Sequence, residues 1–188
     1  MSHQIQKFLI HESRIFGYRA LVLKSQDLLV ALDLALHEGR PTYAQLAQHL
    51  RISVGTAHTA LASAKAAQLV SASGEPHRPN LIEFLIHGAR YTFYPVRTGP
   101  TRGVPTGASQ PVLGERLAGD RAHLVWPEPS GRVRGDGLKP IYPTVPLIVA
   151  EDPALHVILA ALDLIRTGSA RERSVAAEVI QERMASHS

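Results

Sequence analysis

Apolar residues recur every three or four positions over the first half of the chain, in three blocks separated by short polar connections. This spacing places the apolar side chains of each block on one face of a helix. The three predicted helices cover residues 26–38, 43–50 and 54–68. A residue with a helix-capping side chain precedes each of them, namely Ser25, Thr42 and Ser53. Gln45 follows Thr42 at the spacing of a capping box, which strengthens the prediction of the second helix.

The segment after the third helix allows two interpretations. In the first, residues 69–73 and 81–86 are strands that flank a polar loop over 74–80, and together they form a β wing. In the second, Leu81 begins a helix that ends at Gly88, because Leu, Glu and Phe are compatible with either state. The sequence favours the two equally.

The middle of the chain is rich in proline and glycine. Residues 95–153 hold 10 of the 13 prolines, and residues 88–137 hold 9 of the 14 glycines. Core-type side chains such as Trp126 and Val145 recur through this region, so it is not a disordered linker. We expect an extended but ordered arm that lies over another surface.

The two ends of the chain are also apolar. The N-terminal cluster over residues 5–23 suits either a helix or a strand pair, and it packs on the rest of the chain or across a dimer. At the other end, Asp152 caps a helix with Pro153 in its first turn, and Gly168 ends it. A second capping box, Ser169 with Glu172, opens a final helix. The C-terminus is therefore predicted to be a helical hairpin that serves dimerisation or partner binding.

These elements define a fold class and a division of the chain. The fold is expected to be mainly α with a small β wing (α+β). A winged helix-turn-helix domain over residues 1–97 precedes a Pro/Gly-rich arm over 98–151 and a helical hairpin over 152–188.

Charge and composition narrow the function classes. The net charge is +4, and residues 1–100 carry all of this surplus, with 10 Lys and Arg against 6 Asp and Glu. Such asymmetry fits a nucleic-acid-facing first half. Cysteine is absent, which excludes disulfides, thiol nucleophiles and Cys-based zinc fingers. Neither a signal peptide nor an apolar run of membrane-spanning length is present, so we expect a cytoplasmic protein without membrane contact.

The stretch from Thr42 to Leu61, followed by Leu69-Val70, resembles the MarR-like winged helix-turn-helix of bacterial transcriptional regulators. The resemblance rests on the Leu46-Ala47 pair, on Ser53 before the third helix and on the closing Leu69-Val70, and it covers about residues 25–90. Gln68 occupies a position where that family often has a turn glycine. The resemblance implies that the helix over 54–68 is the DNA-recognition helix.

Helical geometry supports the same surface. With alanines on the inner face, the small polar residues of the third helix point to solvent, where hydroxyls and His58 suit the major groove. Basic residues nearby would neutralise phosphates. The candidate DNA-binding residues are Ser53, Gly55, Thr56, His58, Thr59, Ser63, Lys65, Arg78 and Arg90. For His58, base contact and a merely exposed side chain are both open, and Arg40 and Arg51 also suit the C-termini of helices.

Signatures of catalysis and cofactor binding are missing. Walker A, GxGxxG and HExxH sequences are absent, so we expect no catalytic residues, no cofactor and no metal site, with the ten histidines scattered. Tyr91, Phe93 and Tyr94 suit a strand with one aromatic face inward better than a base-stacking surface. Residues 132–137 suit a turn better than an anion site.

The sequence thus predicts a dimeric, sequence-specific regulator of transcription that binds double-stranded DNA, a repressor by family analogy. The alternative is an antitoxin or adaptor that binds a protein partner through residues 98–188 and regulates its own operon through the helix-turn-helix. A three-helix protein-binding module without DNA contact is a further possibility.

Overall fold

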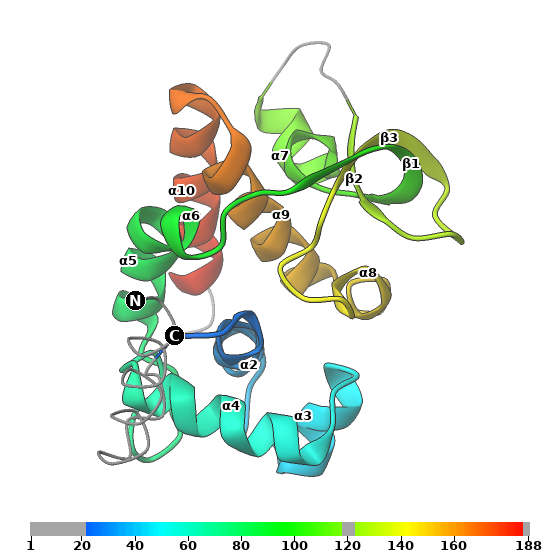
Figure 1. Cartoon of the computed structure of the whole chain (residues 1–188). Helices are drawn as coiled ribbons and strands as arrows, with labels where there is room; N and C mark the ends of the chain where they lie inside the picture. Colours follow the sequence, from blue (N-terminus) through cyan, green and yellow to red (C-terminus); the bar gives the residue numbers. More distant parts are fainter. Residues whose placement is uncertain (1–21, 118–122, 186–188) are drawn as a thin grey trace, which may run out of the picture.

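The computed structural model describes residues 22–117 and 123–185, and the predicted apolar cluster over 5–23 lies almost entirely outside them. The described chain is a mixed fold of helices and one small three-stranded sheet (Figure 1). None of the helices in this part of the chain has the length and apolarity needed to cross a bilayer.

The first three helices follow the sequence prediction closely. They are α2 (Ser25–Leu36), α3 (Tyr43–His49) and α4 (Val54–Ala66). The Thr42 hydroxyl accepts a hydrogen bond from the Gln45 amide at 3.2 Å, which confirms the capping box. The cap predicted at Ser25 is wrong by one residue. Lys24 is the N-cap because the Asp27 carboxylate accepts from its backbone N–H at 2.8 Å.

Helix α2 is the centre of the molecule. Every residue from Asp27 to Leu36 is buried, as expected for a helix that is apolar on most of its circumference. In Figure 1 it lies between α4 below and the C-terminal helices above. Helix α4 packs on α2 through alanines, because Ala57, Ala60 and Ala64 are at most 1% exposed. This arrangement leaves the opposite face of α4 free of the core.

The structure decides between the two interpretations of the segment after α4. Residues 78–92 are helical throughout, as α5 (Arg78–Glu83), the π-helical turn η1 (Phe84–Gly88) and α6 (Ala89–Thr92). Residues 81–88 are therefore helical, as in the second interpretation, but the helical segment begins earlier, at Arg78, and continues past Gly88 to Thr92. The strand over 81–86 is wrong. Between α4 and α5 the described chain contains only an isolated bridge, Val70 to Pro76, in place of a two-stranded wing.

The Pro/Gly-rich region is a folded unit and not an extended arm. It contains β1 (Arg97–Pro105), η2 (Gly107–Ser109), α7 (Pro111–Arg116), β2 (Leu124–Pro127), β3 (Val133–Leu138) and α8 (Val145–Ile148). Strand β1 pairs antiparallel with both other strands, which pair in parallel with each other and close a small barrel. The described residues of this region therefore form strands and short helices, where the sequence predicts an extended arm.

A buried polar network fixes this barrel on α9 (Pro153–Thr167). The Asp163 carboxylate accepts hydrogen bonds from the Thr106 hydroxyl at 2.8 Å, from the Trp126 indole N–H at 2.6 Å and from Arg166 at 2.5 Å. Burial raises the pKa of Asp163, and the Arg166 charge and the hydrogen bonds oppose this rise. Because Trp126 belongs to the barrel and Asp163 belongs to α9, this network joins the barrel to a core helix.

The predicted helical hairpin is confirmed as α9 and α10 (Ala170–Ala185). The Asp152 side chain caps α9 by accepting from the Leu155 amide at 2.9 Å, and the Ser169 amide donates to Glu172 at 2.7 Å. The apolar face of α9 lies inside the same core cluster as α2. The apolar face of α9 is therefore covered by the chain itself, and the role of the hairpin in dimerisation or partner binding stays a prediction.

Candidate nucleic-acid interface and histidine cluster

The outward face of α4 carries the predicted recognition residues. Gly55, His58 and Thr59 are exposed, whereas Thr56 and Ser63 are half-buried. Ser53 is the N-cap of α4, and its hydroxyl accepts from the Thr56 amide at 3.0 Å. Gly55, His58 and Thr59 therefore lie on the side of α4 that is away from the core, and their contact with DNA stays a prediction.

The hydroxyls on this face already have partners within the helix. The Thr59 hydroxyl donates to the Gly55 carbonyl at 3.0 Å, and the Ser53 and Thr56 hydroxyl oxygens are 2.8 Å apart. The ring of His58 lies 5.0 Å from that of Tyr43, a half-exposed residue of α3. The face is therefore stable without a ligand, and oxygen lone pairs remain available to accept further hydrogen bonds.

The predicted basic residues are brought together only in part. Lys65 lies at the end of α4 and donates to the Ala72 carbonyl at 3.0 Å. Arg78 is half-buried and donates to the Ala35 carbonyl at 3.2 Å, at the C-terminus of α2. Arg90 lies over the Tyr91 ring on α6, away from α4 in Figure 1. Of these three cations, Lys65 alone belongs to the α4 surface.

Arg40 and Arg51, for which the sequence left phosphate contact and a role at helix C-termini open, lie in exposed ion pairs. Arg40 donates to Glu75 at 2.7 Å, and Arg51 donates to Glu151 at 3.1 Å. The Arg40 and Arg51 side chains are 70% and 47% exposed. Exposed pairs contribute little stability and exchange readily, so both guanidinium groups remain accessible to phosphates.

Two other predictions for the middle of the chain are wrong. Tyr91 and Tyr94 are not on a strand; they lie at the end of α6 and just beyond it, and both are more than 70% exposed. Residues 133–138 form β3 and not a turn, which places exposed Arg134 directly opposite exposed Arg102.

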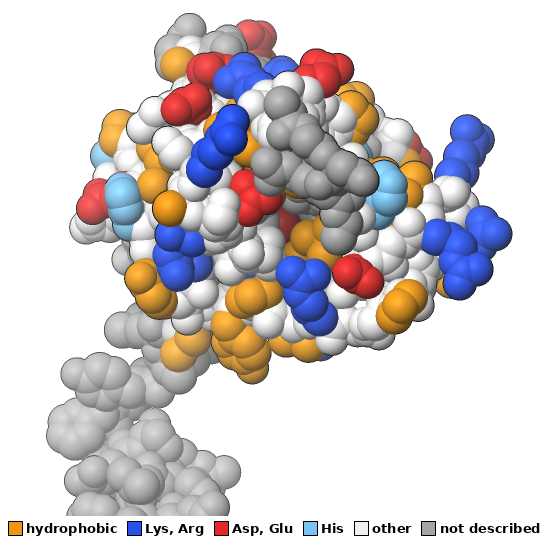
Figure 2. Space-filling view, turned by 90° about the horizontal axis from the view of Figure 1, so that it is seen from above, with side chains coloured by type: hydrophobic (Ala, Val, Ile, Leu, Met, Phe, Trp, Pro, Cys, Tyr) orange, Lys and Arg blue, Asp and Glu red, His pale blue; other side chains and the backbone are white. Residues whose placement is uncertain are grey.

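Figure 2, viewed from the end of the molecule opposite α4, shows acidic and basic side chains mixed, with Lys and Arg gathered at one edge.

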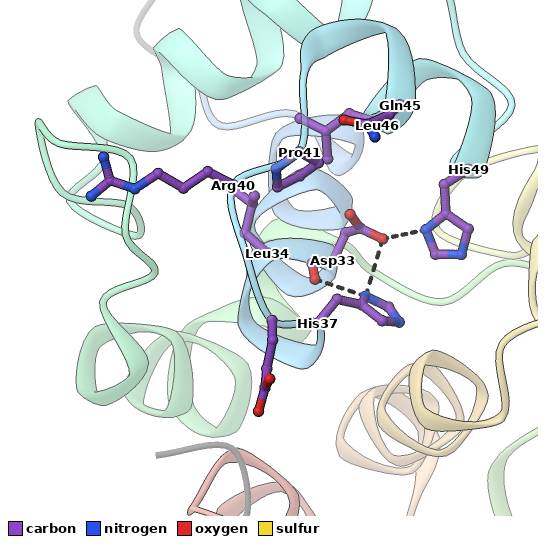
Figure 3. A pocket seen from close by; sticks show the side chains of 9 residues that line it. Asp33, Leu34, His37, Arg40, Pro41, Gln45, Leu46 and His49 are labelled. Atoms are coloured by element: carbon purple, nitrogen blue, oxygen red, sulfur yellow. Dashed lines mark hydrogen bonds and ion pairs between the residues drawn. The ribbon is translucent and has the colours of Figure 1, made fainter.

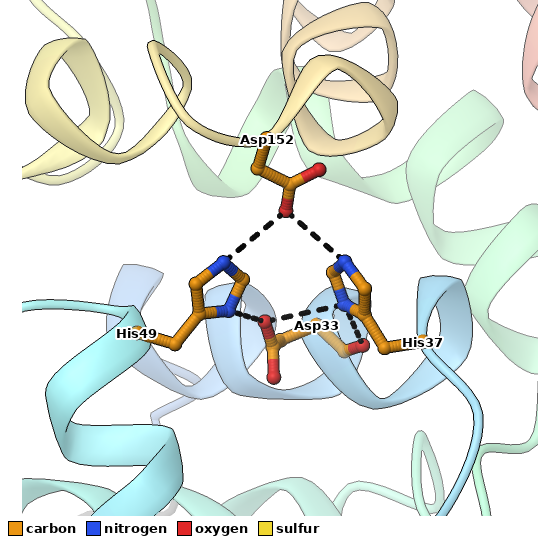
Figure 4. A group of neighbouring side chains, drawn as sticks. All are labelled: Asp33, His37, His49 and Asp152. Atoms are coloured by element: carbon orange, nitrogen blue, oxygen red, sulfur yellow. Dashed lines mark hydrogen bonds and ion pairs between the residues drawn. The ribbon is translucent and has the colours of Figure 1, made fainter.

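The clearest departure from the sequence prediction is a cluster of two histidines and two aspartates. Asp33 lies on α2, His37 just after it, His49 at the end of α3, and Asp152 at the start of α9 (Figure 4). One ligand atom from each of the four side chains lies within 4.8 Å of all the others. The rings of His37 and His49 are 5.1 Å apart and nearly perpendicular. His37 and His49 therefore lie together, and the expectation of scattered histidines is wrong for these two.

Asp33 contacts both imidazole rings, from the lower side in Figure 4. Nδ1 of His49 is 2.6 Å from the Asp33 carboxylate, and Nδ1 of His37 is 2.9 Å from the Asp33 carbonyl oxygen, as seen in the pocket of Figure 3. Since a carbonyl only accepts, His37 Nδ1 carries a proton. Burial raises the pKa of Asp33, and the two histidines oppose this rise.

Asp152 faces the same rings from above. Its Oδ2 lies 3.3 Å from Nε2 of His37 and 3.6 Å from Nε2 of His49. Asp152 is only 4% exposed, and this oxygen is buried without a hydrogen-bond partner. The Asp33–His37 spacing of four on a helix was the one local signal of the cluster in the sequence. His49 and Asp152 join it only through tertiary packing.

No family model, no curated protein and no solved structure matches this chain.

Proposed function

We propose that this protein is a sequence-specific DNA-binding regulator of transcription, with α3 and α4 as the two helices of a helix-turn-helix and α4 as the recognition helix. The observation that carries the proposal is the two-sided construction of α4. Its alanine face is buried on α2, while Gly55, His58 and Thr59 on the other face are exposed. A helix held in this way enters a major groove without disturbing the core.

Electrostatics around α4 supports the same proposal. Ser53 leaves the N-terminus of a 13-residue helix at the surface, where backbone N–H groups and the helix dipole favour a phosphate. Lys65 on α4, and Arg40 and Arg51 in the connections before and after α3, add positive charge. We expect affinity to come mostly from phosphates and to fall steeply with salt, because α4 carries no arginine for bidentate base readout.

Further parts of the proposal rest on the resemblance to MarR-like regulators and on general physics. A homodimer would double the contacts of a recognition helix that reads few base pairs. Since the described α9 face is covered, the dimer contact would come from other surfaces. We assign the protein to the cytoplasm because the bacterial chromosome is there, and repression remains the expectation by analogy.

The test is a salt-dependent titration with duplex DNA from the region upstream of the protein's own gene, with random duplex as control. We expect the wild type to prefer the upstream duplex, and Thr56→Ala/His58→Ala/Thr59→Ala to lose this preference by at least tenfold. A matched variant, His87→Ala/Thr92→Ala/Ser174→Ala, also removes one imidazole and two hydroxyls from exposed positions, but on η1, α6 and α10. Equal binding of both duplexes by the wild type at moderate salt would overturn the proposal.

A second candidate, an adaptor that binds a protein partner, has one specific observation in its favour. Tyr91, Tyr94 and Val96 are exposed in one short segment that runs from the end of α6 to the start of β1. Aromatic residues of this kind are typical anchors of protein interfaces. Deleting the middle region would remove buried core, so Tyr91→Ala/Tyr94→Ala is the better test. Loss of a co-purifying partner with DNA binding intact would favour the adaptor.

A further inference from the structure

We propose that His37, His49 and Asp152 form a binding site for a divalent transition-metal ion, with zinc as the best fit, and that Asp33 orients the two histidines. The site joins the end of α2, the end of α3 and the start of α9 (Figure 4). It stands apart from the outward face of α4 and does not depend on DNA binding.

The first argument is the direction of the imidazole lone pairs. His37 donates from Nδ1 to the Asp33 carbonyl, and Nδ1 of His49 lies 2.6 Å from an Asp33 carboxylate oxygen. A neutral ring that donates from Nδ1 has its lone pair on Nε2. Both Nε2 atoms face Oδ2 of Asp152. With both rings neutral, the two Nε2 lone pairs and the Asp152 oxygen face one another, an arrangement that a bound cation would stabilise.

The second argument is the unpartnered buried oxygen. Oδ1 of Asp152 accepts from the Leu155 amide, but Oδ2 is buried and accepts no hydrogen bond. A buried carboxylate oxygen without a partner is costly, and Asp33 adds a second carboxylate that is 4% exposed. A divalent ion would compensate both charges at once.

The distances fit a metal of the size of zinc. Bonds of 2.0–2.1 Å in a tetrahedron place neighbouring ligand atoms about 3.4 Å apart. The separations between Asp152 Oδ2 and the two Nε2 atoms are 3.3 and 3.6 Å. Imidazole and carboxylate without thiolate suit zinc and its first-row neighbours, whereas magnesium and calcium prefer oxygen ligands alone.

The surroundings have the features of a metal site with an open position. The carboxylate–histidine contacts of Asp33 are the arrangement that fixes ring orientation in histidine-ligated metal sites. The His37 and His49 side chains are 42% and 36% exposed, so an ion has access from solvent. A cleft of about 580 Å³ lies beside the histidines and Asp152, with Glu151, Gln110 and His156 also on its wall. Three protein ligands would leave room for water or a small anion in this cleft.

Metal binding would also fasten parts of the chain to one another. His49 belongs to α3, and Asp152 begins α9, so one ion would cross-link the unit that carries α4 to the C-terminal half. If the proposed DNA-binding function holds, the ion would restrict the orientation of α4. This consequence rests on the proposed function, whereas the metal site itself is tested without DNA.

The test is isothermal titration of the full chain with zinc chloride at pH 7.5, after removal of metals with a chelator and desalting. We expect one zinc ion per chain, with the affinity lowered at least 100-fold in His37→Gln and in His49→Gln. Asp152→Asn keeps the Oδ1 cap of α9 and should lose at least tenfold. Asp33→Asn should lose about 10-fold to 100-fold, as expected for a group that orients a ligand.

Two controls keep the outcome decisive. His58→Gln changes an exposed imidazole on α4 that is outside the cluster, and its zinc affinity should equal that of the wild type. Cobalt(II) should give visible absorption bands of the intensity typical of four or five ligands, and His49→Gln should abolish them while circular dichroism shows a folded chain. Failure of the folded wild type to bind zinc, or binding that the four cluster variants leave unchanged, would overturn the proposal.

Discussion

The outward face of α4 and the cluster below α9 are built in opposite ways. On α4, Gly55, His58 and Thr59 are exposed, and the hydroxyls of Ser53, Thr56 and Thr59 already have partners at the start of the helix. In the cluster, two buried carboxylates face imidazoles, and one oxygen of Asp152 has no donor. The first surface loses nothing when it is empty, whereas the second holds two buried carboxylates that the proposed metal ion would compensate. The proposed DNA-binding surface is therefore distinguished by its exposure, and the proposed metal site by a buried oxygen without a hydrogen-bond partner.

The largest expected effect is a loss of stability at Asp163, a buried carboxylate with three hydrogen-bond donors around it. Asp163 accepts from Thr106, Trp126 and Arg166, and Arg166 is itself only 3% exposed at its side chain. Asp163→Ala leaves this arginine charge buried and should lower the free energy of unfolding by about 3–5 kcal/mol. Urea unfolding measures the change, with exposed Glu178→Ala on α10 as the control. A loss below about 1 kcal/mol would mean that the network is not structural.

The next effect concerns the start of α4. Ser53→Ala removes the acceptor for the Thr56 amide and should cost about 1 kcal/mol of stability. Ser53→Asn restores an N-cap acceptor and should recover most of this loss. Comparison of the two variants in thermal or urea unfolding separates the capping role from any DNA contact of the hydroxyl. Equal losses in both would contradict the capping role.

A smaller effect of opposite sign is expected at Asp152. In chelator-treated protein, Asp152→Asn keeps the cap on the Leu155 amide and removes an uncompensated charge. Its free energy of unfolding should be unchanged or higher, by up to about 1 kcal/mol. The contrast with Asp163 is the sharpest test of the comparison. A loss of about 2 kcal/mol or more would show that protonated histidines compensate the carboxylate instead of a metal.

The smallest effect is a change in pH dependence at His156, on the wall of the same cleft. Burial lowers the pKa of His156 below its ordinary value of 6.5, although its hydrogen bond to the Pro105 carbonyl opposes this. The unfolded chain therefore binds the proton more tightly, so stability falls as the pH drops through 6.5 toward the folded-state pKa. Between pH 7.5 and 5.5, the free energy of unfolding should change less with pH in His156→Gln than in the wild type. The difference between the two changes should be less than about 1 kcal/mol. His58→Gln is the control, and a profile identical to the wild type in His156→Gln would refute the assignment.

The sequence predicted best what is decided locally. Capping pairs such as Thr42 with Gln45 and Ser169 with Glu172 fix helix starts within a few residues, and the structure confirms them. The alanine spacing of α4 likewise predicted which face is buried. These features depend on neighbours in the chain, so one sequence is sufficient to find them.

Features decided by distant contacts were missed. The strands β1 and β3 contain many glycines and charged residues, and they pair only because the barrel closes around them. Residues 81–86 fit either state by local preference, and packing of α5 and η1 on α9 and α10 selects the helix. The histidine cluster depends on α9 reaching His37 and His49, which no local spacing records.

The small barrel also bears on how this protein changes over evolutionary time. At Gly103 a Cβ atom would overlap the Trp126 carbonyl oxygen, and at Gly135 it would overlap that of His123. Any side chain at these positions forces the strands apart, although neither glycine belongs to the apolar core. Homologues that keep the barrel should therefore retain both glycines, while the surface residues around them vary. The spacing of Gly103 and Gly135, together with Trp126, is a sequence pattern by which distant homologues of this chain can be recognised.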